Sequence, residues 1–511
     1  MQEDKLLIDI VYKKDLKTDP QDTIVNIITL EGLSEALEQK DRFTVSQLNV
    51  LAQSRTLGTF SGECNDVMIH IPDSGDAHVH LFVGLGSRDT LNTVVFRNAG
   101  AGLANRVAKM NIHSMVLDLS LRANLEPFTS IKPFVEGIAI GSYTFSKYFR
   151  EKKSFPLGKL TVVIPDYMNR ADARKSMADA ALNIQASNIS RHLTNESSNN
   201  KTPELFESLV YENLATARLD LHTMLDDELC NEKLNLLRAV GQAGSDRPRM
   251  LIMEDIRLDR SFCLGIVGKA VTFDAGGLML KSPESLPYMR DDVAGAASVI
   301  GLMSVLRELN LDFNVVCAIP IAENLLDSKA YRPADVFNTR WNLSVEVTNT
   351  DSEGRLIMAD AFMYLQDMYQ LNALVDVATL TGAIARSLGN KMSGYFTNDD
   401  RMSHLLEQAQ TRSCEKFWRF PLEQSYRHLL KSAFAYVKNE GGNPKAISAA
   451  LFLETFVKNG VPWLHMDLGS VISPGVDDPL YGNPEYTTGI PAITLVEFLR
   501  LLNDNLKQFD Y

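Results

Sequence analysis

Residues 263–281 read CLGIVGKAVTFDAGGLMLK, and this stretch decides the fold of the second half of the chain. The nearly continuous apolar run at 263–273 is typical of a strand that is buried on both faces of a parallel sheet. Lys269 lies inside that run, Asp274 follows it, and Lys281 comes after a further apolar triplet. Each residue alone is commonly a snorkelling lysine or a turn-starting acid. Three such placements close together indicate a site, because lysine is rarely buried unless it is paired or ligating.

Apolar strands and helices continue to alternate to the end of the chain. Further strands are predicted at 313–321, 343–349, 373–380 and 463–469, and helices at 291–309, 355–369 and 445–458. Continuous apolar strands separated by helices predict a mostly parallel sheet with helices on both faces. In such sheets ligands bind beyond the carboxyl ends of the strands.

The first half of the chain also has an α/β pattern with buried strands. Its apolar runs lie at 80–86, 92–102, 114–120 and 160–165. Residues 168–193 predict one long helix, and the polar segment NESSNNK at 195–201 predicts an unstructured linker.

A chain of 511 residues is too long for one ordinary core. We therefore predict an α/β protein of two domains. These are a smaller N-terminal α/β domain (1–166), a linker helix and loop (167–199), and a larger C-terminal domain (200–511) with the mostly parallel sheet.

Composition restricts the partners of the chain. The net charge of −13 disfavours nucleic acid as the main partner. No apolar run approaches the roughly 18 residues that span a bilayer, and the acidic start MQEDKLLIDIVYKK does not resemble a signal or transit peptide. We expect a cytoplasmic protein whose scattered cysteines are reduced core thiols, namely Cys64, Cys230, Cys263, Cys317 and Cys414.

The common catalytic motifs are absent. The sequence has no HExxH, GxSxG, GxGxxG or GxxxxGK[ST] motif, and its nine histidines form no paired metal motif. A metal site in this chain would therefore be built from carboxylates.

Two further segments supply such carboxylates. In YMRDDVAGAAS (288–298), Asp291 and Asp292 precede a helix, so we expect one to cap it and the other to have a different role. In NTDSEGRL (349–356), Asp351, Glu353 and Arg355 occupy alternate positions. On an extended backbone they would share one face, about 6.5–7 Å apart. Two carboxylates so close repel each other unless a proton, a cation or Arg355 lies between them.

Together the segments offer four acids (Asp274, Asp292, Asp351 and Glu353) beside Lys269. Two divalent cations would neutralise these acids, and such ligands suit Mn²⁺, Mg²⁺ or Zn²⁺. A lysine can ligate only as the neutral amine. Two adjacent metals form a known hydrolytic device, which serves peptide and phosphate ester bonds alike.

These segments resemble the leucyl aminopeptidase (cytosol aminopeptidase) family. The similarity covers roughly residues 185–511, and NTDSEGRL is close to a signature of the family that usually has Ala where Ser352 stands. It also includes NKTPELF (200–206), VGQAGSDRPRML (240–251), ATLTGA (378–383) and HMDLG (465–469). The N-terminal half is similar only loosely, through its α/β pattern and GSYTFSKY at 141–148.

The resemblance implies that 200–511 is a two-metal exopeptidase domain. The tighter metal site would comprise Lys269, Asp274, Asp292 and Glu353. The more exchangeable site would comprise Asp274, Asp351 and Glu353. Lys281 would stabilise the oxyanion of the scissile carbonyl, and Arg355 would hold a bicarbonate ion that acts as general base.

The resemblance also implies the substrate pocket, lined by Met289, Thr379, Gly382 and Ala446. Three residues depart from the usual pattern: Ala270 and Ala294 replace glycines, and Asp291 replaces a small uncharged residue. We expect Asp291 to be the extra acid, solvated and capping the helix or adding negative field, and Asp292 to be the ligand.

The implied activity is metal-dependent release of N-terminal amino acids, leucine and other apolar residues first, from peptides with a free N-terminus. Two divalent ions per subunit are expected, Zn²⁺ or Mn²⁺ with Co²⁺ and Mg²⁺ as further candidates, together with bicarbonate. The resemblance implies a homohexamer. The alternatives are a non-catalytic scaffold or nucleic-acid-binding protein on the same fold, and a two-metal phosphoesterase.

Overall fold

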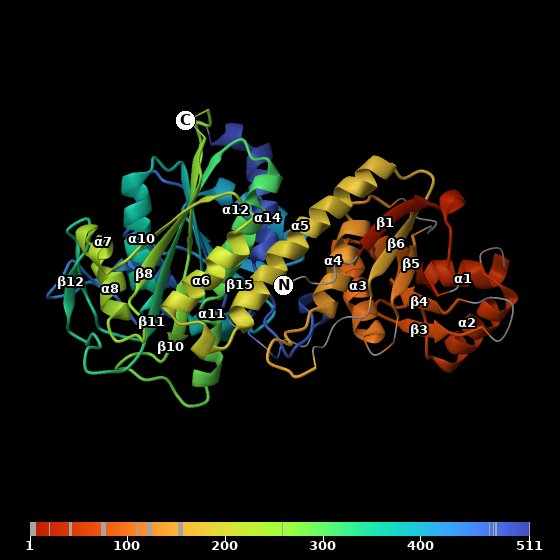
Figure 1. Ribbon diagram of the computed structural model, residues 1–511, viewed down its shortest axis with the longest axis horizontal. Coiled ribbons are helices and arrows are strands. Elements are labelled where there is room, and N and C mark those ends of the chain that lie inside the picture. Colours follow the sequence, from red (N-terminus) through yellow and green to blue (C-terminus); the bar gives the residue numbers. More distant parts are fainter. Residues whose placement is uncertain are drawn as a thin grey trace. The chain divides into compact units, whose positions relative to one another are not determined.

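The computed structural model divides the chain into two compact units (Figure 1). It describes residues 7–19, 21–39, 43–72, 78–108, 110, 112–119, 125–151, 157–257, 259–469, 471–473, 475 and 478–509. The first unit comprises 1–184 and 477–484, and the second comprises 185–476 and 485–511. The division falls inside helix α5 (Arg170–Asn195), on which most of the predicted linker 167–199 lies. No feature of the sequence predicted that 477–484 would return to the first unit.

The first unit is built on a six-stranded sheet in the order β1-β6-β5-β2-β4-β3. All neighbouring pairs are parallel except β3 with β4. The strands are β1 (Leu7–Tyr12), β2 (Thr23–Ile28), β3 (Val67–His70), β4 (His80–Gly84), β5 (Ser114–Asp118) and β6 (Lys159–Ile164). The predicted runs at 80–86, 114–120 and 160–165 thus contain strands, although residue 120 lies outside the described residues.

The run at 92–102 is a helix and not a strand. Helix α3 (Thr93–Val107) starts there because the Asn92 side chain accepts hydrogen bonds from the Val94 and Val95 N–H groups, at 3.0 and 3.1 Å. Gly100 in the run lets α3 pack closely on α4 (Ile131–Ser142), since a Cβ there would overlap the carbonyl oxygen of Phe134. The other helices of this unit are α1 (Leu30–Gln39) and α2 (Val45–Leu57).

The second unit is built on a nine-stranded mixed sheet in the order β16-β15-β18-β14-β9-β11-β8-β7, with β10 paired to β11. Its strands are β7 (Asp220–Met224), β8 (Arg249–Asp255), β9 (Cys263–Gly268), β10 (Ala270–Asp274), β11 (Asn314–Asn324), β14 (Ala373–Ala378), β15 (Ser393–Thr397), β16 (Phe417–Arg419) and β18 (Trp463–Asp467). The central pairs from β18 through β14 and β9 to β11 are parallel. A small separate sheet contains β12 (Val336–Asn338), β13 (Ser344–Glu346) and β17 (Val437–Lys438).

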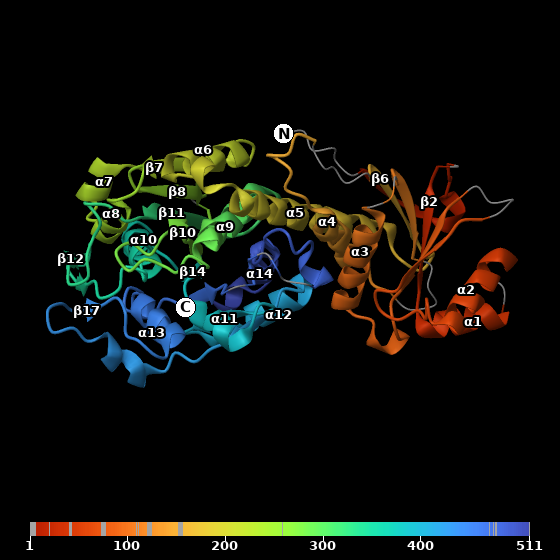
Figure 2. The ribbon, with the colours of Figure 1, turned by 90° about the horizontal axis from the view of Figure 1, so that it is seen from below.

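Helices cover both faces of the large sheet (Figure 2). Val267 of β9 lies in the apolar core with α10 (Gly354–Met368), whereas a Cβ on its neighbour Gly268 would meet Ala296 of α9 (Ala294–Val305). Successive strand residues face opposite sides, so α9 and α10 lie on opposite faces. The other helices are α6 (Pro203–Leu214), α7 (Asp226–Asn231), α8 (Asn235–Gly241), α11 (Gly382–Leu388), α12 (Asp400–Ser413), α13 (Lys445–Glu454) and α14 (Ala492–Asp504).

Two local predictions in this unit were wrong. The run 263–273 is two strands and not one, because the chain breaks at Lys269, whose N–H donates to Val377 and whose carbonyl accepts from Ala296. The linker 195–201 is not unstructured. It contains a short 3-10 helix (Ser198–Asn200), and Glu196 and Lys201 in it are buried.

The five cysteines differ in how deeply they are buried. Cys317 and Cys414 are buried, but Cys64 and Cys263 are half-buried and Cys230 is exposed, so the prediction of five core thiols was wrong. Among the described residues, no helix has the length and apolar character needed to cross a bilayer.

Two glycines of α3 provide a test of the packing. Gly100→Ala should destabilise the first unit by about 1–3 kcal/mol, because the new methyl group overlaps the backbone of α4. Gly102→Ala is the matched control, since a Cβ there meets only the Asn65 side chain at 3.7 Å and alanine favours a helix by up to about 1 kcal/mol. Thermal unfolding of the two variants measures the difference, and equal melting temperatures would contradict this account of the α3–α4 packing.

Candidate metal centre and active site

The predicted site residues gather at the carboxyl ends of the central strands. Lys269 follows β9, Asp274 ends β10, and Thr379 follows β14. Asp292 and Glu353 come just before α9 and α10. Because these strands are parallel, their carboxyl ends lie at one edge of the sheet, which is where ligands bind in such folds.

Lys269 contacts three other residues of this group. Its side chain is only 3% exposed, and its Nζ lies 2.8 Å from Asp292 Oδ1, 3.0 Å from Glu353 Oε1 and 2.8 Å from the carbonyl oxygen of Thr379. The break between β9 and β10 directs this side chain to the helix starts. Gly354 makes room for it, since a Cβ there would lie 2.5 Å from Lys269 Cε.

Lys281 joins the other two carboxylates. Its Nζ lies 2.7 Å from Asp274 Oδ2 and 2.5 Å from Asp351 Oδ1, and its side chain is 17% exposed. Asp274 Oδ1 also accepts hydrogen bonds from the Gly276 N–H at 2.9 Å and from Asn324 Nδ2 at 2.8 Å. The two lysines therefore flank one carboxylate cluster.

The acids of NTDSEGRL converge, but not along an extended strand. Glu353 has helical dihedral angles (φ −74°, ψ −38°), and Arg355 lies in the first turn of α10. The prediction that these residues share one face of an extended backbone was therefore wrong. Carboxylate oxygens of Asp274, Asp351 and Glu353 nevertheless lie within 4.8 Å of one another, because the turn before α10 brings two of them to the end of β10.

Burial makes the cluster electrostatically unfavourable on its own. Burial, reinforced by the charge of Glu353, raises the pKa of Asp274 to about 8 and that of Asp351 above its usual value. Burial also raises the pKa of Asp292 to about 6, despite the nearby Lys269. Glu353 is the exception, because Lys269 and Lys281 outweigh its burial and lower its pKa.

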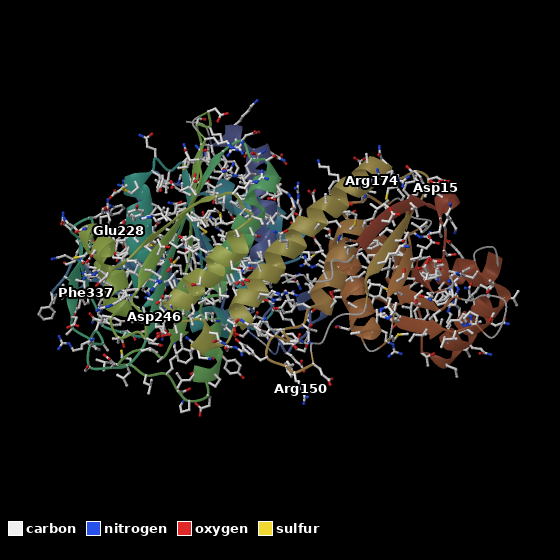
Figure 3. The ribbon with its side chains drawn as sticks, in the orientation of Figure 1. Asp15, Arg150, Arg174, Glu228, Asp246 and Phe337 are labelled. Carbon is white, nitrogen blue, oxygen red and sulfur yellow. The ribbon has the colours of Figure 1, made fainter. Side chains whose placement is uncertain are left out.

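The pKa values of the two lysines also lie above their usual values. Burial alone would lower the pKa of Lys269 and of Lys281, but the surrounding carboxylates outweigh it and raise both. With all four carboxylates ionised, the two ammonium groups leave a net charge of −2 in a largely buried space, and the raised pKa of Asp274 shows that this charge is unfavourable. Glu228 of α7, by contrast, is an acid that lies exposed on the surface of this unit (Figure 3).

The donor atoms fit divalent cations. Asp292 Oδ2 is buried and accepts no hydrogen bond from any described residue. The cluster consists of carboxylate oxygens, which are ligands of Mn²⁺ and Zn²⁺, and of Lys269, whose ammonium group would have to lose a proton before it could ligate. Lys269, Asp274, Asp292, Asp351 and Glu353 are thus the residues that could hold metal ions.

Asp291 differs from its prediction. It is not solvated but only 2% exposed, and it lies 3.3 Å from Arg290 Nε in a 3-10 helix (Leu286–Asp291). Neither Asp291 nor Asp292 caps α9, because Val293 holds the N-cap position and makes no side-chain cap. Burial raises the pKa of Asp291 to about 6.

Sequence reasoning missed several residues that support the cluster. Asn324 is fully buried at the end of β11, and its Nδ2 donates to Asp274 Oδ1 at 2.8 Å and to the Thr350 carbonyl at 2.9 Å. Tyr331 donates its hydroxyl to the same carbonyl at 2.7 Å. A signal for Asn324 existed, because it is a polar residue at the end of a buried apolar run.

The predicted pocket residues lie on different elements. Thr379 contacts the cluster directly, since its hydroxyl donates to Asp292 Oδ1 at 2.5 Å. Met289 is half-buried three residues before Asp292, Gly382 is exposed at the start of α11, and Ala446 is buried in α13. The roles of these residues in substrate binding stay predictions.

Arg355 is held close to the cluster. Its side chain is 4% exposed, its Nη1 donates to the Asn439 carbonyl at 2.7 Å, and its Nη2 lies 3.8 Å from Glu440 Oε2. Its Nε is buried without an acceptor among the described residues. A buried guanidinium with an unused N–H is suited to binding an oxyanion.

Comparison with known proteins agrees with this geometry. Residues 188–496 match the sequence profile of the cytosol aminopeptidase family, catalytic domain, and residues 31–153 match the N-terminal domain of the same family. A probable cytosol aminopeptidase of Acidobacterium capsulatum is 33% identical over 448 residues, which are 87% of each chain. That of Geotalea uraniireducens is 34% identical over 452 residues, covering 86% of this chain and 89% of the relative.

Solved structures of similar fold include two related enzymes. The bottromycin maturation enzyme BotP in complex with Mn has a TM-score of 0.83 and 30% identity, covering 94% of this chain and all (100%) of that one. A mutant of the tomato leucine aminopeptidase has a TM-score of 0.85 and 26% identity, covering 97% of this chain and 96% of that one. Since the family profiles match both units and the relatives match along most of their length, the chain belongs to the cytosol aminopeptidase family and is a metal-dependent aminopeptidase that acts on peptides.

Proposed function

We propose that this aminopeptidase uses two divalent cations at the cluster and releases leucine and other apolar N-terminal residues. The observation that carries this proposal is the pair of lysine contacts. Lys269 Nζ lies between Asp292 and Glu353, and Lys281 Nζ lies between Asp274 and Asp351. Four carboxylates are thereby assembled around one small volume, and the charge of two divalent cations would balance their four negative charges.

We assign to the two ions the ligand sets that the family resemblance implies. Lys269, Asp274, Asp292 and Glu353 would hold the tighter ion, and Asp274, Asp351 and Glu353 the more exchangeable one. When bound, the two ions supply Lewis acidity that activates water and polarises the peptide carbonyl. Mn²⁺ is favoured by the Mn complex of BotP, and Zn²⁺, Co²⁺ and Mg²⁺ are further candidates.

The remaining polar groups would bind the substrate, stabilise the oxyanion and hold the general base. An ammonium group has three N–H bonds, so Lys281 retains one beyond its contacts with Asp274 and Asp351, and this bond would stabilise the oxyanion of the scissile carbonyl. The free carboxylate oxygen of Asp292 would bind the α-amino group of the substrate, which restricts cleavage to the first peptide bond. Arg355 would hold bicarbonate as the general base through its unused N–H.

The pocket for the first side chain would be lined by Met289, Thr379, Gly382 and Ala446. Apolar or small groups from these four positions favour an apolar side chain such as leucine. We further propose a cytoplasmic homohexamer, with residues 1–166 as the N-terminal domain, 167–199 as the linker and 200–511 as the catalytic domain.

Metal removal tests the proposed function. A site of carboxylates and amine, without His or Cys, should release its exchangeable ion readily. Dialysis against a chelator should abolish hydrolysis of a leucyl amide, and Mn²⁺, Co²⁺ or Zn²⁺ should restore it. Full activity in exhaustively metal-free protein would exclude the two-metal mechanism.

The role of Lys281 can be separated from metal binding. Lys281→Ala should lower kcat by roughly 10²–10³-fold, because the oxyanion loses a charged donor. Metal content, measured by atomic emission, should stay at the wild-type level. Lys329→Ala, at an exposed lysine, is the control and should leave kcat unchanged. A near-normal kcat in Lys281→Ala would remove this role.

Asp291 and Asp292 allow a matched pair of substitutions. Asp292→Asn should lose the tighter ion and nearly all activity, since Asp292 contacts Lys269 directly. Asp291→Asn should keep both ions, with at most about a tenfold change in kcat/KM, or roughly 1.4 kcal/mol. The reverse pattern in metal content would show that Asp291 is the ligand.

A further inference from the structure

The segment after β17 lies against the loop that presents Asp351 and Glu353. Asn439 in this segment is fully buried, and its main-chain N–H donates to the Glu346 carbonyl at 3.0 Å. The loop itself, residues 348–352, has no regular secondary structure. Within it the Ser352 N–H donates to the Asn349 carbonyl at 3.3 Å. The other main-chain N–H and carbonyl groups of the loop need further partners, because an irregular backbone satisfies few of them itself.

The Asn439 side chain satisfies those groups. Its Oδ1 accepts hydrogen bonds from the N–H groups of Thr348 at 2.8 Å and Asn349 at 3.2 Å. Its Nδ2 donates to the carbonyls of Asn349 at 2.7 Å and Ser352 at 3.3 Å. The carboxamide thus uses two donors and two acceptor sites, which is its whole hydrogen-bonding capacity.

Asn439 also holds the Arg355 side chain, through its main-chain carbonyl. The Asn439 carbonyl accepts a hydrogen bond from Arg355 Nη1 at 2.7 Å. The next residue, Glu440, accepts a hydrogen bond from the Ser352 hydroxyl at 2.7 Å. One buried segment therefore contacts the loop on both sides of Asp351 and also fixes the guanidinium that follows Glu353.

The chemistry of the amide makes the contact specific. A side chain that only accepts, such as Asp, would remove both donated bonds, so that the Asn349 carbonyl keeps only the Ser352 N–H as a donor. One without polar atoms would remove all four bonds. Buried amides of this kind fix one backbone conformation, because all of their hydrogen bonds form only when every partner is in place.

We propose that Asn439 is a positioning residue of the metal centre, which sets the loop so that Asp351 and Glu353 meet the end of β10. Asn439 would touch neither metal nor substrate. This inference rests on the proposed two-metal function, because it assigns Asn439 an effect on metal affinity that acts through two proposed ligands. Supporting residues of this type typically change metal affinity or activity by about 10–100-fold when substituted.

Asn314 offers a matched control in the same unit. It is also a buried asparagine, 8% exposed, whose side chain accepts from the Arg257 N–H at 2.8 Å and donates to the Arg260 carbonyl at 3.1 Å. It begins β11, whereas the other end of that strand reaches the cluster at Asn324. Asn314→Ala therefore removes similar bonds at the end of the strand away from the metal centre.

The experiment measures Mn²⁺ binding by calorimetry after chelator treatment, together with thermal unfolding and hydrolysis of a leucyl amide at saturating Mn²⁺. Asn439→Ala should raise the dissociation constant of the weaker Mn²⁺ site about 10–100-fold. Asn439→Asp, which keeps the acceptor but sets a carboxylate oxygen against the carbonyls of Asn349 and Ser352, should raise it by at least as large a factor. Asn314→Ala should lower the melting temperature while its Mn²⁺ dissociation constants stay within about twofold of wild type.

The outcomes separate the inference from the function it rests on. Wild-type affinity for Mn²⁺ in folded Asn439→Ala, or in Asn439→Asp if the alanine variant does not fold, would overturn the positioning role. An equal loss of affinity in Asn314→Ala would also overturn it, because the effect would then be one of general stability. If wild-type protein itself binds no Mn²⁺, the proposed two-metal function fails instead.

Discussion

The arrangement of the site depends on one buried ion pair network, centred on the Lys269 ammonium between Asp292 and Glu353. The three side chains come from a strand break and from the starts of two helices on opposite faces of the sheet. A lysine in that place is costly to bury unless it is paired. The pairing therefore fixes the distance between the starts of α9 and α10, and with it the positions of the two acids.

Three glycines near the site let the elements that carry these side chains pack closely. Gly268 and Gly295 let α9 approach the sheet, since a Cβ at Gly268 would meet the Ala296 backbone and a Cβ at Gly295 would overlap the Val377 carbonyl. Gly354 leaves space for the Lys269 side chain. Small residues at these positions allow backbone elements to pack closely enough for short acidic side chains to reach one volume. Ala270 and Ala294 stand nearby and are buried, so the single methyl that each carries is accommodated in the packing.

The sequence allowed the fold and the acids of the site to be predicted for a physical reason. Buried parallel strands are continuous apolar runs, and the ends of β10, β14 and β18 followed from such runs, whereas the break between β9 and β10 did not. The run at 92–102 was misassigned because apolar residues with glycine also suit a helix packed closely on another helix, and the deciding Asn92 cap is a local signal of one residue. Asp291 was misplaced because its burial depends on tertiary packing. Asn324 stands out as a polar residue at the end of an apolar run, but no local pattern encodes the partners of Asn324 and Asn439, which lie 26 and 90 residues away in the sequence.

The charge of the cluster connects stability with function. Burial raises the pKa of three of its four carboxylates, so the folded chain carries an electrostatic cost at this edge of the sheet. The lysines reduce that cost but leave a net negative charge, and the supporting amides of Asn324 and Asn439 hold the acids in place against their mutual repulsion. Any cation that binds the folded state alone shifts the folding equilibrium toward it. In the proposed function, the repulsion between the acids would therefore be the source of metal affinity. The amide contacts prevent the loop that carries Asp351 and Glu353 from moving away and relieving that repulsion.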